Sequence, residues 1–150
     1  MLPSPSSAGS SPADTASSTE QEISVGDYKY EYTINTEDGT ATITKFRAPD
    51  DHGSYDITIP TAFGRFPVTD IGDYAFSGCH SLTTLSLGEK ITKIGDYAFD
   101  DCRILNNVTI PQSVTSIGDH AFELCKYMTS VTINDAATSI GEAAFEQCEH

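Results

Sequence analysis

Residues 68–90 read VTDIGDYAFSGCHSLTTLSLGEK, and the pattern returns as ITKIGDYAFDDCRILNNVTIPQS in 91–113, VTSIGDHAFELCKYMTSVTINDA in 114–136 and ATSIGEAAFEQCEH in 137–150. Each segment starts 23 positions after the one before it (91 − 68 = 23), and they align without a gap. A fixed period of this length is typical of stacked structural repeats. The sequence therefore predicts a solenoid, with three full repeats and a truncated fourth over residues 68–150.

Five columns of the repeat hold one residue type in all four copies. These columns are Ile71, Ile94, Ile117 and Ile140; Gly72, Gly95, Gly118 and Gly141; Ala75, Ala98, Ala121 and Ala144; Phe76, Phe99, Phe122 and Phe145; and Cys79, Cys102, Cys125 and Cys148. Apolar residues that recur at the same place in every coil predict a shared buried face. We expect the four phenylalanines to form a single column.

The residue order within one coil indicates its local structure. Residues 85–87 alternate apolar and polar side chains, as a half-buried strand does, and residues 68–71 form a second extended segment. We expect Gly72 to free the backbone for a reversal, and Asp73 to open a helical turn by accepting its N–H groups. The expected fold class is an α/β repeat solenoid: a right-handed coil of short parallel strands with a short helical turn in each coil.

The segment before the repeats has the features of an N-terminal cap. A tyrosine-rich stretch over residues 28–46 alternates around an Asp38-Gly39 turn, which predicts a β-hairpin. Residues 55–60 align with part of a repeat and predict a first half-coil. Hairpin and half-coil together, over residues 23–67, are the capping unit that a solenoid needs.

The two ends of the chain differ in composition. Residues 1–22 consist mostly of Ser, Thr, Pro, Ala and Gly, for which we expect a disordered tether. At the other end the sequence stops at His150, inside the fourth repeat and without a polar cap. This ending is what a fragment of a longer array would show, and it leaves open end-to-end self-association through the uncapped coil.

Composition argues against several classes of partner. The 22 acidic and 8 basic residues give a net charge of −14, which repels phosphate backbones and anionic lipid headgroups. We therefore expect no nucleic acid or membrane-surface partner. No apolar run is long enough to cross a bilayer, so we expect no membrane insertion, and the N-terminus lacks the basic and apolar segments of a secretion signal.

The repeat pattern I-G-D-x-A-F-x-x-C-x-x-L-x-x-V-x-I-P, with the tyrosine-rich hairpin, resembles the BspA-like subfamily of leucine-rich repeats. The resemblance covers roughly residues 26–150. Together with the capping segment that begins at residue 23, we expect residues 23–150 to form one leucine-rich-repeat domain. It implies a secreted or surface-attached protein, with adhesion to a protein or glycan of a host or neighbouring cell as the style of function. The family has no shared catalytic residues to carry over.

We predict neither catalysis nor a cofactor for this chain. It contains no G-x-S-x-G, Walker, H-E-x-x-H or glycine-rich dinucleotide motif. The cysteines come one per coil, in an inward column, and are expected to be buried reduced thiols. The four histidines lack the spacing of zinc ligands, so no metal site is predicted.

One acidic column leaves two readings open. Asp73, Asp96, Asp119 and Glu142 occupy equivalent positions, where like charges repel unless something compensates them. A calcium ion between coils is one solution. Caps on helical turns are the reading that we favour, because a cap already supplies each carboxylate with backbone donors.

Two outward-facing sets of residues are candidate binding surfaces. Polar side chains on the predicted strands would form ladders of the type that repeat proteins present to partners: Thr58, Thr84, Ser86, Asn107, Thr109, Ser130 and Thr132. An aromatic column would place rings on successive coils, where they could stack on a sugar or a peptide: Tyr74, Tyr97 and His120. Solvated strand faces also prefer Ser and Thr, and tyrosines can simply shield a core.

These expectations define two hypotheses for function. The first is a non-catalytic extracellular or cell-surface module that recognises a protein or glycan through these faces. The second is a structural spacer or accessory domain of a larger surface protein or enzyme. Binding that is lost when surface residues are replaced, with the fold intact, distinguishes the first from the second.

Overall fold

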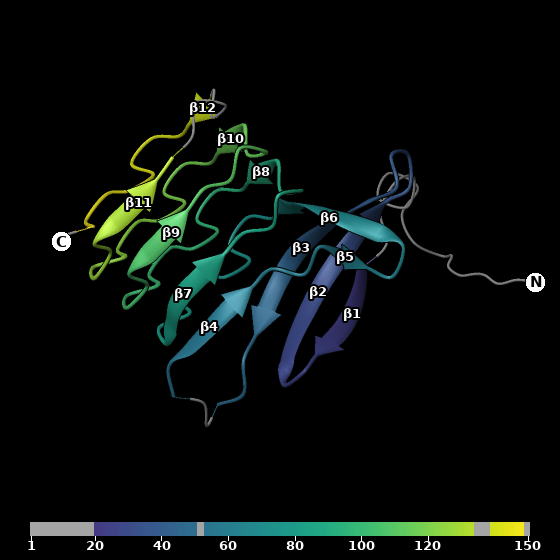
Figure 1. Ribbon diagram of the computed structural model, residues 1–150, viewed down its shortest axis with the longest axis horizontal. Coiled ribbons are helices and arrows are strands. Elements are labelled where there is room, and N and C mark those ends of the chain that lie inside the picture. The colour runs from purple at the N-terminus through teal and green to yellow at the C-terminus, as the bar shows by residue number, and fades with distance from the viewer. Residues whose placement is uncertain (1–19, 51–52, 134–138, 149–150) are drawn as a thin grey trace, which may run out of the picture.

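The computed structural model describes residues 20–50, 53–133 and 139–148, which form a β-solenoid of about four turns with stacked parallel strands (Figure 1). None of the described segments is a helix that could cross a membrane. The strands are β1 (Glu20–Val25), β2 (Tyr28–Asn35), β3 (Thr40–Arg47), β4 (Tyr55–Thr58), β5 (Ala62–Phe63), β6 (Phe66–Ile71), β7 (Leu82–Ser86), β8 (Lys93–Ile94), β9 (Asn107–Thr109), β10 (Ser116–Ile117), β11 (Ser130–Thr132) and β12 (Ser139–Ile140).

Each coil contributes one strand to each of two sheets. One sheet runs in the order β1-β2-β3-β6-β8-β10-β12, with β5 beside β6, and the other in the order β4-β7-β9-β11. In the second sheet Leu85 pairs with Val108 and Val108 with Val131 in parallel register. Each of these steps spans one repeat, so the strand register follows the period of the sequence.

The predicted hairpin is present and begins the first sheet. Strands β2 and β3 pair antiparallel, and β3 then pairs parallel with β6, so that Ile43 lies beside Ile71. Strand β1 is an additional antiparallel strand on β2. Because β1 begins at Glu20, the tether expected over residues 1–22 ends earlier than predicted; its residues 1–19 lie outside the described residues.

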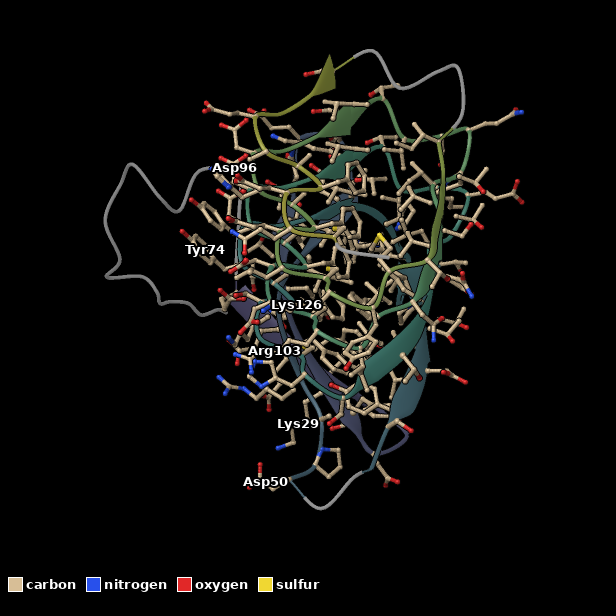
Figure 2. All side chains as sticks on the ribbon, turned by 90° about the vertical axis from the view of Figure 1, so that its left-hand side faces the viewer. Lys29, Asp50, Tyr74, Asp96, Arg103 and Lys126 are labelled. Atoms are coloured by element: carbon tan, nitrogen blue, oxygen red, sulfur yellow. The ribbon has the colours of Figure 1, made fainter. Side chains whose placement is uncertain are left out.

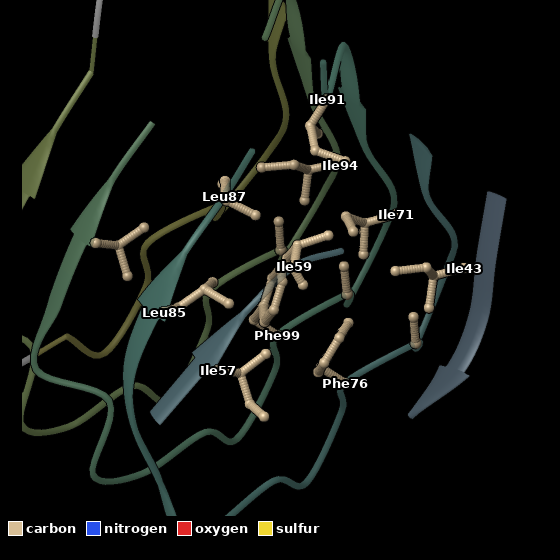
Figure 3. Packing of buried hydrophobic residues seen from close by; sticks show 14 of the residues in the cluster. Ile43, Ile57, Ile59, Ile71, Phe76, Leu85, Leu87, Ile91, Ile94 and Phe99 are labelled. Carbon is tan, nitrogen blue, oxygen red and sulfur yellow. The ribbon is translucent and has the colours of Figure 1, made fainter. Parts of the chain in front are cut away.

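The core is built around the predicted phenylalanine column. The rings stack coil on coil, with centroids 4.9 Å apart for Phe76 and Phe99, 5.1 Å for Phe99 and Phe122, and 5.2 Å for Phe122 and Phe145. Phe46 of the hairpin extends the stack at 4.8 Å from Phe76. Isoleucines and leucines of both sheets pack around these rings (Figure 3). The cap thus continues the core of the repeats.

The helical turn predicted in each coil is wrong, since the described residues contain no helix. The backbone passes through the left-handed region at the residue after the acidic one, with φ of 60° at Tyr74 and 57° at Tyr97, and this conformation interrupts a right-handed helix. The N–H of Tyr74 donates to the carbonyl of Asp96 at 3.0 Å, and that of Phe76 to Ala98 at 2.7 Å. Hydrogen bonds to the next coil replace those of a helix.

The predicted role of the repeat glycines also needs correction. Gly95 and Gly118 do not have positive φ; the reversal occurs at Tyr97 and His120 instead. A Cβ at Gly118 would lie 2.6 Å from the backbone nitrogen of Asp96 in the preceding coil. The glycine is therefore required because the coils approach too closely for a side chain.

Candidate binding surface

The polar strand residues form two parallel rows on the outer face of the sheet β4-β7-β9-β11. The register aligns the members of each row across neighbouring strands. Every one of these side chains is exposed. The first row is Asp56, Thr84, Asn107 and Ser130, and the second is Thr58, Ser86, Thr109 and Thr132.

Alternation along each strand produces this face. In β7 and β9 the side chains of Leu85 and Val108 are buried, so the residues on either side of them point outward. Alternation in the sequence predicted seven of the eight row residues, all except Asp56. The alignment of residues 55–60 with 106–111 sets Asp56 opposite Asn107, and that signal could have identified it.

The rows carry little charge for so acidic a chain. Asp56 is the single ionisable side chain among the eight, and its carboxylate accepts a hydrogen bond from Thr83 at 2.7 Å. Asn107 accepts one from Thr129 at 3.2 Å. Within the described residues, the hydroxyls of Thr84, Ser86 and Thr109 have no protein partner, so they remain available to a ligand that offers hydrogen-bonding groups.

The aromatic column is also assembled as predicted, but its rings face one another. Ring centroids lie 4.8 Å apart for Tyr74 and Tyr97 and 4.7 Å for Tyr97 and His120, with interplanar angles of 3° and 10°. Desolvation and neighbouring groups, Tyr74 foremost, raise the pKa of Tyr97. Because each ring covers the next, a sugar could not enter between coils. Tyr74, at 53% exposed, is the most accessible ring of this column (Figure 2).

The acidic column lies beside the aromatic one and joins the coils directly. Asp73 Oδ1 accepts the N–H of Asp96 at 2.8 Å, Asp96 Oδ1 that of Asp119 at 2.8 Å, and Asp119 Oδ1 that of Glu142 at 2.7 Å. The predicted cap on a helical turn of the same coil is therefore wrong, although each aspartate does accept a backbone donor. This hydrogen bond is the compensation expected for the column, and we assign no calcium to it.

We expect the Asp96→Ala substitution to lower the free energy of unfolding by about 1–2 kcal/mol, since it leaves the N–H of Asp119 without its acceptor. Asp96→Asn keeps an oxygen at that position and should cost much less. Urea denaturation followed by circular dichroism measures both. Equal losses in the two variants would mean that the charge, and not the hydrogen bond, stabilises the column.

Histidine and carboxylate groups meet at two further places. His80 Nε2 lies 2.8 Å from Asp101, and His120 Nδ1 lies 2.9 Å from Glu123. The ligand atoms of His120, Glu123 and Glu146 all lie within 4.8 Å of one another. The imidazole is already engaged by Glu123 and stacked on Tyr97, and exposed carboxylates often approach without an ion, so we assign no metal to this group.

The cysteine column points inward, as predicted. Cys102 and Cys125 are fully buried, Cys79 and Cys148 partly, and all four thiols are free. The S–H groups of Cys102, Cys125 and Cys148 each donate to the carbonyl of the phenylalanine in the preceding coil, at 3.2 to 3.4 Å. Burial raises the pKa of Cys102 well above its usual value, whereas a hydrogen bond from Cys102 lowers that of Cys79. These contacts give the thiols a structural role.

Comparison with solved structures supports the solenoid fold. The T. pallidum leucine-rich repeat protein TpLRR aligns with a TM-score of 0.63 at 20% identity, over 85% of this chain and 68% of that one. A leucine-rich repeat protein from Bacteroides capillosus aligns with a TM-score of 0.53 at 29% identity, over 75% and 98%. The pneumococcal vaccine antigen PcpA aligns with a TM-score of 0.55 at 17% identity, over 85% and 47%.

Sequence comparison identifies the family. No curated protein matches this chain. A family model described as a BspA type leucine rich repeat region, in six copies, matches residues 55–150, which is more than half of the chain. This range contains the four repeats and the half-coil before them. The chain therefore belongs to the BspA-type leucine-rich repeat family.

Proposed function

We infer that this chain is a non-catalytic recognition module of a secreted or surface-attached protein, and that it binds a protein or a glycan through the two polar rows. The observation that carries this proposal is the exposed, in-register and almost uncharged face of β4, β7, β9 and β11 on a chain of net charge −14. Members of the BspA-type family are mostly surface proteins, which supports the location. Repeat families of this kind are typically not enzymes.

The size of the face limits what it can hold. Four strands at ~4.8 Å spacing, with about four residues each, span on the order of 20 by 13 Å. A standard protein interface buries ~800 Å² on each partner, which is several times this area. The rows therefore suit a short segment, either an extended peptide or a few sugar units, and a folded partner would have to reach adjoining loops or further coils.

Replacement of Thr109 and Thr132 by alanine tests this proposal. These threonines lie side by side in the second row, and we expect the double variant to bind its ligand at least about tenfold more weakly. Binding is measured on an array of immobilised glycans and extracellular-matrix proteins. The matched control replaces Thr61 and Thr92, two exposed threonines outside the rows, and should bind as the original chain does.

The result that contradicts the proposal is the absence of saturable binding by the original chain, or equal binding by both double variants. Unfolding by urea shows whether each variant keeps the fold. A chain that folds and binds nothing would favour the alternative function, a structural spacer in a larger protein.

A further inference from the structure

Basic side chains gather on one edge of this acidic molecule. His80, Arg103 and Lys126 occupy equivalent positions in successive coils (103 − 80 = 23; 126 − 103 = 23), and we call them the basic column. Figure 2, a view along the coils, shows Arg103 and Lys126 on the same side of the molecule as Lys29 and Asp50. None of these residues belongs to the surface described above.

The backbone of each coil directs the basic column outward. The residue two positions before each basic side chain has a left-handed conformation, with φ of 76° at Gly78, 58° at Asp101 and 62° at Leu124. In each coil a cysteine lies between this left-handed residue and the basic residue. The cysteine side chain points into the core, so the basic side chain that follows it points to solvent. The N–H of Tyr127 donates to the carbonyl of Arg103 at 3.1 Å and fixes one coil against the next.

Asp101 holds two members of the column in place. Its carboxylate contacts Arg103 Nε at 2.7 Å and His80 Nε2 at 2.8 Å, and the hydrogen bond from Arg103 is the main reason that the pKa of Asp101 is lowered. The side chains of Arg103 and His80 nevertheless stay 56% and 54% exposed. The guanidinium keeps N–H donors free for an external anion.

The N-terminal hairpin extends this edge. Lys29 pairs in register with Arg47, and Lys45 lies near enough to Cys79 for its charge to contribute to lowering that thiol's pKa, after the hydrogen bond from Cys102. Five of the eight basic residues thus lie in the hairpin and the basic column, and among the described residues Arg47 pairs with Glu31 and Arg103 with Asp101.

We propose that the basic column binds an acidic glycan, a saccharide chain that carries sulfate or carboxylate groups. A linear array of cations at the coil spacing suits a polymer whose anionic groups recur along it. Tyr127, adjacent to Lys126 and 58% exposed, offers an aromatic side chain to a sugar ring.

The overall acidity of the chain does not prevent this binding. At physiological ionic strength charges are screened beyond roughly 8 Å, so a short anionic ligand responds mainly to the local charge. The same screening predicts binding that weakens as salt increases.

A heparin oligosaccharide is the probe that tests this proposal, with binding to the whole chain measured by isothermal titration calorimetry at several salt concentrations. We expect the Arg103→Ala, Lys126→Ala double variant to bind at least about tenfold more weakly, because two charges of the column are lost. The matched control, Lys90→Ala with Lys93→Ala, removes two exposed lysines elsewhere and should bind within about twofold of the original chain.

Three results would overturn the proposal. The first is no binding of heparin at low salt, and the second is equal weakening of heparin binding in the two double variants. The third is a poly-glutamate peptide that binds as tightly as heparin, with an affinity that Tyr127→Ala does not change. The last result would assign the edge to acidic peptides. Thr109 and Thr132 lie on a different face from the basic column. Loss of binding at the polar rows can therefore be distinguished from loss of heparin binding at the basic column.

Discussion

Substitution of Gly118 by alanine is expected to lower the free energy of unfolding by at least about 3 kcal/mol, and to leave much of the chain unfolded. A Cβ at this position would lie 2.6 Å from both the nitrogen of Asp96 and the carbonyl carbon of Gly95. These are backbone atoms, so no side-chain rotation relieves the overlap. The coils would have to separate, which would lengthen the hydrogen bonds between them.

Gly53 provides the matched control for this substitution. Nothing lies within 4 Å of a Cβ built there, and its φ is not in the left-handed region, so Gly53→Ala should change stability by less than about 0.5 kcal/mol. Urea unfolding followed by circular dichroism compares the two variants. A Gly118→Ala protein as stable as the control would show that the coils do not approach as closely as described.

The second large effect is expected for Phe99→Ala, with a loss of about 3–5 kcal/mol in the free energy of unfolding. Phe99 is fully buried and stacks on Phe76 at 4.9 Å and on Phe122 at 5.1 Å. Its removal leaves a cavity in the middle of the column and breaks two ring contacts. The neighbouring coils cannot close over it, because their spacing is set by backbone hydrogen bonds.

Phe145→Ala is the comparison for this variant. Phe145 is partly buried and, among the described residues, stacks on Phe122 alone, at 5.2 Å. Phe145→Ala should therefore lower the free energy of unfolding clearly less than Phe99→Ala does. The loss in the free energy of unfolding for Phe99→Leu should fall between those for Phe99→Ala and Phe145→Ala, since leucine retains apolar volume and loses the ring stacking. Equal losses for Phe99→Ala and Phe145→Ala, measured by the same urea unfolding, would contradict the continuous column.

Much of the architecture could be predicted because the repeat is gapless. Identical residues at a constant period must occupy equivalent places in successive coils, so the phenylalanine column, the two strands per coil and the polar rows all followed from alignment and alternation. The hairpin followed from its own alternation around Asp38-Gly39. Strand β1 was missed, because its first residues, Glu20 and Gln21, have the polar character of a tether.

The basic column was present in the same alignment but was not recognised. His80, Arg103 and Lys126 differ in residue type, so they do not form a column of identical letters as the cysteines beside them do. Lys29 and Arg47 join them only because the hairpin pairs with the first coil, a contact between segments far apart in the chain. Charge at equivalent positions, rather than identity, was the signal available in the sequence.

The amino-acid sequence decided which side chains stack, because a strict period leaves one arrangement that superimposes equal columns. It did not decide where the backbone N–H groups of the turn find acceptors. A helix and a ladder to the next coil satisfy the same donors, and only the assembled coils, brought close by glycine, selected the ladder. The left-handed turns at Tyr74 and Tyr97 and the bonds of Asp73 and Asp96 to the following coil are consequences of that choice.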